Sequence, residues 1–431
     1  MRVGRRARVL VVCLAGLVCA QQKTQPPASE IDKAVEEFKV QTRNLGLRPE
    51  SPRPAAANGV VSHWHGRVYE NFRNDSLDAI PHEIRQRGGS KALLQRNQFG
   101  FNVSGPVVIP RLIQGSRSTY FSLSYEGVRE HISRTFLRTI PTAQERTGDY
   151  STIVDQAGNI LPIYDVRSTR PNPSYDPAQP VSQGNLQYLR DPFPGNRIPD
   201  SRLDRVALKA LESYPQPNAA VGPFFRNNYF INSPETNTAN GMIGKLDHTY
   251  RERHRLTTEL AFSNGFLGAA KWFPTAANPG PNDRHFESRR GSLEHVFTVS
   301  AHTVNTVTFG ATSDSSNSGT EEQANYAGEI GLQGVSGQAF PLFQFQPYLS
   351  MGRSYPIFRN ARNTYAWTDS LSTRRGKHAL QVIAQHMRIQ VNTFWPQYPA
   401  GSFRFSPGLT SLPGIINTGQ AFASFLLGLS E

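Results

Sequence analysis

Residues 97–128 read NQFGFNVSGPVVIPRLIQGSRSTYFSLSYEGV, and this stretch decides the fold. From Phe121 to Glu126 apolar side chains alternate with polar ones, which in an extended chain places the two kinds on opposite faces. The first half alternates in the same way around Phe99 and Phe101. Because residues 110–117 include Pro, Gly and Ser, we expect an antiparallel hairpin with a short connection. Its apolar face must be covered either by other protein or by lipid.

The same pattern recurs along the chain. A first strand is predicted at 62–72, and three further hairpins at 242–250 with 255–263, 288–299 with 303–311, and 364–373 with 378–390. Their turns are short, whereas the connections between hairpins, at 264–287, at 312–363 and after 390, are long. Short turns that alternate with long loops are typical of outer-membrane barrels, and strands of about ten residues suit a tilted crossing of a bilayer. Outward aromatic residues near strand ends would form an interfacial girdle: Tyr125, Tyr250, Tyr365 and Trp367.

A long segment, residues 129–241, shows little alternation and is rich in Pro, Asn, Asp and Gly. Loops of this length are usually functional, so we expect it to fold on itself or to cap something. A short helix is predicted at 200–214, where apolar residues recur at helical spacing and Pro215 ends the pattern. The segment is our candidate for contact with a substrate or partner on the outer face.

Charge and composition narrow the classes of protein. The 431 residues carry a formal charge of +13, and removal of four arginines near the N-terminus leaves 42 basic against 33 acidic residues, or +9. These charges are scattered along loops and turns, so the evidence for a nucleic acid partner is weak. A cationic surface that meets anionic lipid headgroups explains the charge at least as well. The mean hydropathy of −0.46 does not exclude a membrane barrel, because alternating strands average to a polar sequence.

The N-terminal residues are typical of an export signal. Residues 1–20 have a basic start, an apolar stretch and a small residue at Ala20, which predicts a signal peptide cut after that position. A lipoprotein site at Cys19 is the alternative, although Val18 is bulky for one. Both cysteines, Cys13 and Cys19, lie in this segment. Residues 21–60 are predicted to be a linker with one short helix around Ile31–Phe38.

Catalytic constellations are scarce. His63 and His65 share one face of a candidate strand and could bind a metal ion, but a third ligand is not identifiable. Asp247, His248 and His254, and likewise Asp283 with His285, are expected to be polar groups of turns or of a lumen. We therefore expect no enzyme, no catalytic or metal residues and no cofactor. Gly100 and Gly105 lack the following helix of a dinucleotide site, so close packing of strands explains them better.

Several phrases resemble one known family, the Oar-like TonB-dependent outer-membrane transporters of acidobacterial type. They are NFRNDSLDA at 71–79, RNQFG at 96–100 leading to SGPV at 104–107, YF at 120–121 leading to YEG at 125–127, IPT at 140–142, GDYS at 148–151, RDPFPGNRIP at 190–199, GKLDH at 244–248 and AFASFLLG at 421–428. The resemblance implies a large outer-membrane barrel that contains a plug and takes up or exports material with TonB energy.

The expected fold is therefore all-β: an antiparallel transmembrane barrel segment, residues 61–431, with long extracellular loops and minor helix. Residues 21–60 leave no room for a plug, and about nine candidate strands fall short of the 22 of large plugged transporters. We expect a truncated or split gene product, located in the outer membrane, whose partners are membrane lipid, an unknown ligand, the TonB complex and a separately encoded plug or barrel remainder. No nucleic acid partner is expected. The alternative is a secreted, soluble β-rich binding or adhesion protein.

Overall fold

The computed structural model describes residues 63–80, 82, 91–107, 118–154, 158–219, 226–319 and 324–431. The predicted signal peptide, the 21–60 linker and its helix lie outside these residues. Within them, nine strands form one sheet: β1 (His65–Asn74), β2 (Leu94–Pro106), β3 (Thr119–Arg138), β6 (Tyr229–Tyr250), β7 (His254–Gly268), β8 (Arg284–Ser300), β9 (Thr303–Gly319), β11 (Ile357–Arg375) and β12 (His378–Phe394).

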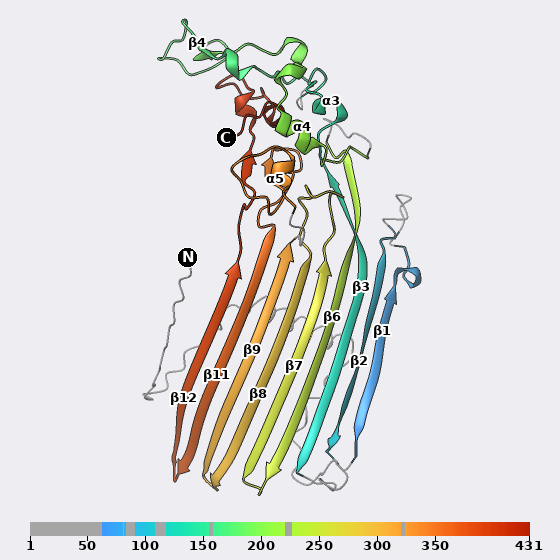
Figure 1. Cartoon of the computed structure of the whole chain (residues 1–431), viewed down its shortest axis with the longest axis vertical. Helices are drawn as coiled ribbons and strands as arrows, with labels where there is room; N and C mark the ends of the chain where they lie inside the picture. Colours follow the sequence, from blue (N-terminus) through green and yellow to red (C-terminus); the bar gives the residue numbers. More distant parts are fainter. Residues whose placement is uncertain are drawn as a thin grey trace.

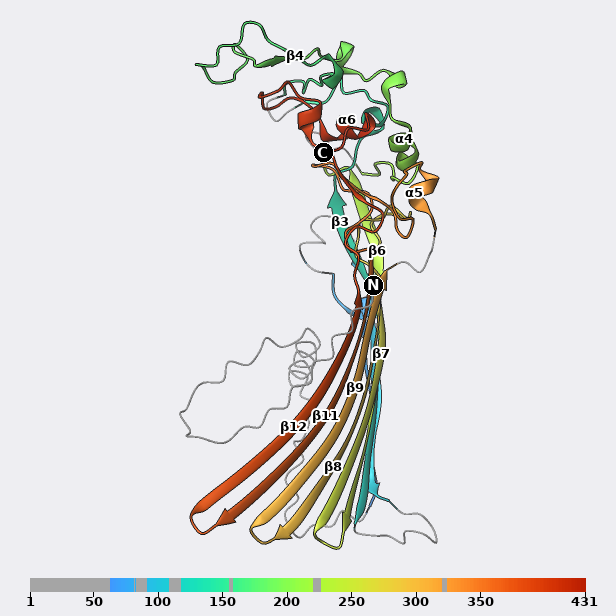
Figure 2. The same cartoon turned by 60° about the vertical axis from the view of Figure 1, so that its left-hand side comes forward.

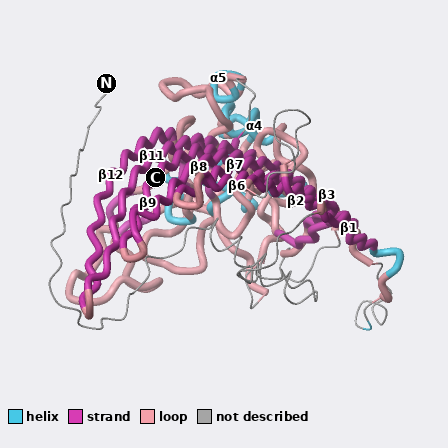
Figure 3. Tube along the Cα trace, turned by 90° about the horizontal axis from the view of Figure 1, so that it is seen from below, coloured by secondary structure: helices cyan, strands magenta, loops and turns pink. Residues whose placement is uncertain are grey.

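The sheet is an antiparallel meander in which each strand pairs with the next strand of the sheet along the chain. Figure 1 shows the strands side by side and tilted, and Figures 2 and 3 show that the sheet is curved. β1 and β12 each have one paired neighbour and form the two edges, so the described strands make an open wall. The structure thus confirms the predicted all-β fold, a segment of a barrel that does not close.

The two ends of the sheet differ in their connections. At the lower end in Figure 1, two or three residues separate β6 from β7, β8 from β9, and β11 from β12. β2 and β3 are joined at this end by residues 107–118, and the other connections lie at the upper end. The predicted alternation of short turns and long loops is therefore confirmed, and the four predicted hairpins are all present.

The strands are longer than predicted, mainly at the upper end. β3 continues to Arg138 and β6 begins at Tyr229, so the sheet extends into both sides of the predicted 129–241 loop. The outward side chains of these extensions are polar, as at Thr236, Thr238 and Asn240. Apolar side chains of these extensions, such as Ile231 and Phe136, instead face inward to the loops, so the outward apolar alternation that marks a lipid-facing strand is lost.

The pairing register separates the two faces of the wall, since directly paired residues of neighbouring strands lie on the same face. One row joins Phe101, Tyr125, Met242 and Phe262. The opposite face carries Gln98, Glu126 and other polar groups: the Tyr69 hydroxyl donates to the Glu126 carboxylate at 2.8 Å and the Gln98 amide donates to it at 3.1 Å. The wall thus has an apolar face and a polar face, as a barrel with a wet lumen requires.

The apolar face is limited to the lower part of the sheet and is exposed. On β6 it extends from Met242 to Tyr250, which are 47% and 51% exposed. Eight residues span about 27 Å along a strand, and a tilt of about 40° reduces this to about 21 Å of membrane depth, near the ~25 Å of lipid-facing bands. Above this band the same face becomes polar, with Asn240 on β6 and Arg289 on β8.

The predicted girdle residues border this band in part. Tyr250 ends β6 at the lower border. Tyr125 and Tyr365 lie inside β3 and β11 and not near strand ends. Both stand at the upper border of the apolar band, where the outward face becomes polar. Trp367 is the next outward residue below Tyr365 on β11. Among the described residues, every helix is too short or too polar to span a bilayer.

Candidate functional site: a cap built from the long loops

The long loops fold together into one body, called here the cap. It consists of the described residues of 139–228, 269–283, 320–356 and 395–431, and it stands at the upper end of the sheet in Figures 1 and 2. Its helices are α3 (Ala143–Arg146), α4 (Arg205–Leu211), α5 (Tyr326–Glu329) and α6 (Ala421–Leu426). Two small sheets complete it, β4 (Arg170–Pro171) with β5 (Tyr188–Leu189), and β10 (Leu342–Gln344) with β13 (Ser402–Arg404).

The cap has its own hydrophobic core, which draws on all four segments. Its fully buried large apolar side chains are Ile140, Tyr150, Ile163, Phe273, Phe345, Met351, Phe422, Phe425 and Leu426. The core continues onto the sheet through Tyr229, Ile231 and Phe136. These three lie on the polar, lumen-side face by the register of β3 and β6. The cap is therefore packed against the inner side of the wall at the mouth.

α6 is the centre of this core. All six of its residues are buried, and Phe425 lies with its ring centroid 5.0 to 5.6 Å from those of Phe345, Phe405, Phe422 and Phe343. Tilted and edge-to-face pairs at these distances add to the energy of burial. The phrase AFASFLLG is thus a packing element.

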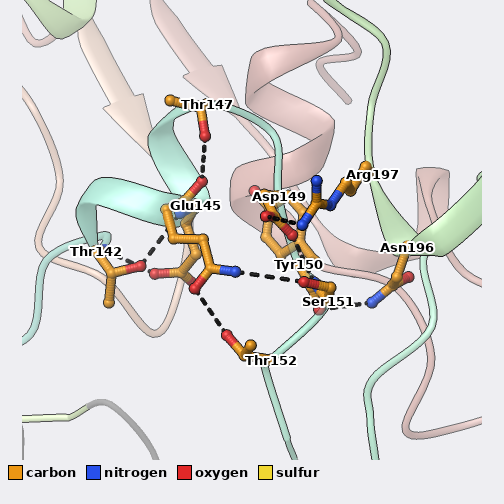
Figure 4. Close-up of polar contacts among 10 residues, drawn as sticks. Thr142, Glu145, Thr147, Asp149, Tyr150, Ser151, Thr152, Asn196 and Arg197 are labelled. Atoms are coloured by element: carbon orange, nitrogen blue, oxygen red, sulfur yellow. Dashed lines mark hydrogen bonds and ion pairs between the residues drawn. The ribbon is translucent and has the colours of Figure 1, made fainter.

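The phrase IPT begins α3 with a capping box. The Thr142 hydroxyl accepts from the Glu145 amide at 3.2 Å, and the Glu145 carboxylate accepts from the Thr142 amide at 2.7 Å (Figure 4). Glu145 is only 1% exposed and also accepts a hydrogen bond from the Tyr348 hydroxyl. Burial raises the pKa of the Glu145 carboxyl, although the hydrogen bonds from Tyr348 and Thr142 oppose this shift.

The neighbouring Arg146 is also buried and links two parts of the cap. Its guanidinium donates to the carbonyls of Pro141 at 3.1 Å, Tyr214 at 2.9 Å and Pro215, and it lies 4.9 Å from the centroid of the Tyr214 ring. Burial lowers the pKa of Arg146. Because its donors are directed at main-chain carbonyls, the arrangement supports a structural role.

GDYS at 148–151 and the centre of RDPFPGNRIP form one interlocked turn, shown in Figure 4. Asp149 accepts from the Ser151 amide at 2.9 Å and pairs with Arg197 at 2.9 Å. The Asn196 amide donates to the carbonyls of Tyr150 at 2.8 Å and Leu161 at 3.0 Å. Asn196 has a φ of 58° and follows Gly195 at 61°, and this left-handed turn aims its side chain at those carbonyls.

The start of RDPFPGNRIP attaches the C-terminal segment. Arg190 donates to the carbonyls of Gly408 at 3.3 Å, Leu409 at 3.3 Å and Ser411 at 2.7 Å. Close by, Arg202 forms a two-pronged ion pair with Asp165 at 2.7 and 2.8 Å. The hydrogen bonds from Arg202 lower the pKa of the Asp165 carboxyl. The phrases quoted from the cap segments therefore meet in this single body.

The glycines of the first hairpin are explained by close packing, as predicted. A Cβ on Gly100 would lie 2.4 Å from the Tyr125 carbonyl oxygen and 2.7 Å from the Tyr69 hydroxyl, and one on Gly105 would lie 2.6 Å from the Trp64 ring. On Gly127 it would lie 2.6 Å from the Phe99 ring. These positions accept only glycine without a shift of neighbouring groups.

The two histidines considered as metal ligands, His63 and His65, lie at the start of β1. His65 lies on β1 within hydrogen-bonding distance of the Ser104 hydroxyl, at 2.9 Å, and His63 is exposed beside it. The sequence predicts His248 and His285 in turns or in the lumen, whereas the register places both on the outward face, beside Leu256 and Phe266. His248 lies 2.8 Å from the Thr119 hydroxyl, and the His285 ring is tilted against Phe266 with the centroids 4.6 Å apart. The described residues contain no group of three or more His, Cys, Asp or Glu arranged to hold a metal.

The predicted 200–214 helix is present in shorter form. α4 covers Arg205–Leu211 and begins at Asp204, whose carboxylate accepts from the amides of Val206 and Ala207 at 2.9 Å. Residues 200–202 form a separate 3₁₀ turn because the backbone at Leu203 is extended. The helix packs Ala207 and Ala210 into the cap core.

Together these features define a class of protein. One curved antiparallel wall exposes an apolar band on one face and polar groups on the other, and a folded cap stands at its long-loop end. A soluble sandwich would need a second apolar sheet packed at about 10 Å, and the two further sheets among the described residues have only two strands each. The wall is therefore that of a membrane barrel.

Comparison with known proteins identifies the family. Residues 62–431 match the model described as an outer membrane beta barrel domain. The chain belongs to this family, which assigns it to the outer membrane. No curated protein matches.

Two solved structures were compared with the chain. The outer membrane transporter YddB from Escherichia coli has 7% identity and a TM-score of 0.37, over 79% of this chain and 33% of that one, so the match spans about a third of that protein's length. OmpF from Salmonella typhi, solved in complex with daunomycin, has 6% identity and a TM-score of 0.09, over 76% of this chain and 96% of that one.

Proposed function

We propose that this protein forms part of the wall and the outer mouth of a TonB-dependent, Oar-like transporter or receptor. The observation that carries the proposal is the cap. The phrases of the Oar-like resemblance at 140–142, 148–151, 190–199 and 421–428 all lie in it, and its core joins the inner face of the wall through Tyr229 and Ile231. A folded body at this place would meet a ligand before it enters the lumen, so the cap is the ligand- or partner-contacting region.

The two free edges support a larger assembly. Unpaired backbone groups cannot face hydrocarbon, so β1 and β12 need further strands beside them. β12 also carries apolar side chains on the lumen-side face, where water alone would favour polar ones: Ile383, Met387, Ile389 and Val391 are 45 to 58% exposed. We infer that strands outside these nine complete the wall, and that a plug-like protein element, on this chain or another, covers this inner face. Binding and passage, without catalysis, are the proposed activity.

Orientation can be tested by cysteine labelling of the full chain in cells, since the sequence has cysteine only at positions 13 and 19, within the predicted signal peptide. Ser182 is exposed in the cap and Ala301 lies in a short turn. A membrane-impermeant maleimide is expected to label S182C in intact cells and A301C only after permeabilisation. Recovery of the protein in the soluble periplasmic fraction, or the opposite labelling, would contradict the proposed mouth.

TonB dependence needs a second position. Ser370 lies on the lumen-side face of β11 by its register with Thr306 and Ile383. If an energised plug moves against this face, S370C should react faster in cells with the energising complex than in cells without it, while S182C should react equally in both. Equal rates for S370C would refute the TonB-dependent part and leave the membrane wall standing.

A further inference from the structure

The lower end of the sheet carries a concentration of positive charge, called here the short-turn rim. It comprises the turns at 251–253, 301–302 and 376–377 with Arg374 and Arg375 at the end of β11. Five cations are exposed there, Arg251, Arg253, Arg374, Arg375 and Lys377, against the single acid Glu252. Among the described residues, the ion pairs at this end join Lys245 and Arg255 to Asp247 and leave those five cations without an acidic partner.

An aromatic and imidazole cluster lies directly above this rim, on the apolar face. The register places Tyr250, His254 and Phe297 in one row. The His254 ring stacks on Phe297 at 4.3 Å, and its Nδ1 lies 3.1 Å from Nε2 of His295. Arg251 covers the Tyr250 ring at 4.9 Å. A hollow on this face is lined by His248, Tyr250, His254, Leu256 and His295.

The position of this cluster decides what it can bind. It stands at the lower border of the apolar band, where the bilayer changes from hydrocarbon to headgroups. The upper part of the hollow is apolar, because Leu256 faces outward there. Arg251 and Arg253 lie in the turn directly below the hollow. A ligand that fits must therefore have an apolar part level with Leu256 and an anionic part level with Arg251 and Arg253.

We propose that the short-turn rim is a binding site for anionic glycerophospholipid, with the phosphate between Arg251, Arg253 and the His254–His295 pair and the acyl chains on the outward side chains of β6 and β7. The short turns of outer-membrane barrels face the periplasm, so the lipid belongs to the inner leaflet. Basic side chains next to an anionic lipid surface are attracted by its negative surface potential. The rim would fix the depth of the wall in the membrane.

The test uses the full chain in detergent micelles with spin-labelled phosphatidylglycerol or phosphatidylcholine, and measures the motionally restricted lipid fraction. We expect a several-fold preference for phosphatidylglycerol that weakens as salt is raised, because exposed charges are screened. R251Q/R253Q should abolish the preference. R205Q/R359Q removes two exposed arginines from the cap and the upper sheet and should retain it.

Two further variants sharpen the test. E252Q removes the one acid of the rim and should increase the preference, a gain that misfolding would not produce. H254F keeps a ring on Phe297 but removes the imidazole nitrogens and should reduce the preference in part. The proposal would be overturned if the wild type retained both lipids equally. It would also be overturned if R205Q/R359Q lost the preference as much as R251Q/R253Q does, or if the protein retained lipid A more strongly than phosphatidylglycerol. Because lipid selectivity is measured without TonB or a transported ligand, failure here is distinct from failure of the transporter proposal.

Discussion

Truncation of Phe425 to alanine should open the cap and leave the wall intact. Phe425 is 1% exposed and its ring meets four other phenylalanines. A buried phenylalanine removes at least about 150 Å² from water, which at about 25 cal/mol per Å² corresponds to about 4 kcal/mol. Measured Phe to Ala changes in cores, which include the cavity left behind, cost about 3–5 kcal/mol.

This loss can be measured locally by hydrogen exchange and mass spectrometry on the full chain in detergent. At about 1.4 kcal/mol for each factor of ten, F425A should speed exchange of cap amides by roughly two to three orders of magnitude. The Tyr150 amide, bonded to the Asn196 carbonyl at 3.0 Å, is one reporter. Peptides from β7 and β8 should be unchanged.

F230A is the matched control. Phe230 lies on β6 beside the cap but is 46% exposed, so its truncation removes little burial. It should leave cap exchange near that of the wild type. If F425A changes cap exchange by less than about tenfold, or if it speeds β7 and β8 equally, then the cap is not a separately cooperative body and the reasoning fails.

Three further outcomes are expected. R190A removes the donors to three carbonyls of the C-terminal segment and should make residues 407–412 more sensitive to protease by one to two orders of magnitude, from a loss of about 1.5–3 kcal/mol, whereas R167A, at an exposed side chain, should not. The pKa of Asp165 is lowered in the folded protein, so its stabilising effect is present above the ordinary pKa of 3.8 and is lost as pH falls through the folded pKa. In thermal melts, D165N should remove this decrease of stability at acid pH. The pKa of Glu145 is raised, so cap stability should decline as pH rises from 4.5 through the folded pKa, and E145Q should flatten this decline, while an unchanged slope would show that another group titrates.

The sequence predicted the lower half of the wall well because lipid forces a strict alternation there. Residues such as Leu256 and Leu260 must face outward, and the turns between strands are too short to allow another arrangement. The upper half was underestimated for the opposite reason. Above the apolar band the outward face no longer meets lipid, and part of the inner face packs against the cap, so residues 229–241 of β6 lack the outward apolar alternation.

The sequence located one part of the cap, within residues 129–241, but not the body that the four segments build together. The family-like phrases were visible, and α4 was predicted from its spacing and from Pro215. The contacts between these phrases could not be predicted. Arg190 binds carbonyls more than two hundred residues away, and the sequence RDPFPGNRIP does not indicate which residues they are. The cationic rim was likewise present in the turns at 251–254 and 374–377, but only the register shows that they lie at one border.

The distances along the chain between contacting residues have a consequence for how the protein assembles. Three of the wall hairpins, β6–β7, β8–β9 and β11–β12, close turns of two or three residues, a step with small loop-closure entropy. The cap core needs contacts as remote as Arg190 with Ser411, 221 residues apart, and α6 lies near the end of the chain. Contacts of such high order form slowly. We therefore expect the hairpins with short turns to form before the cap, so that the mouth of the barrel becomes native last.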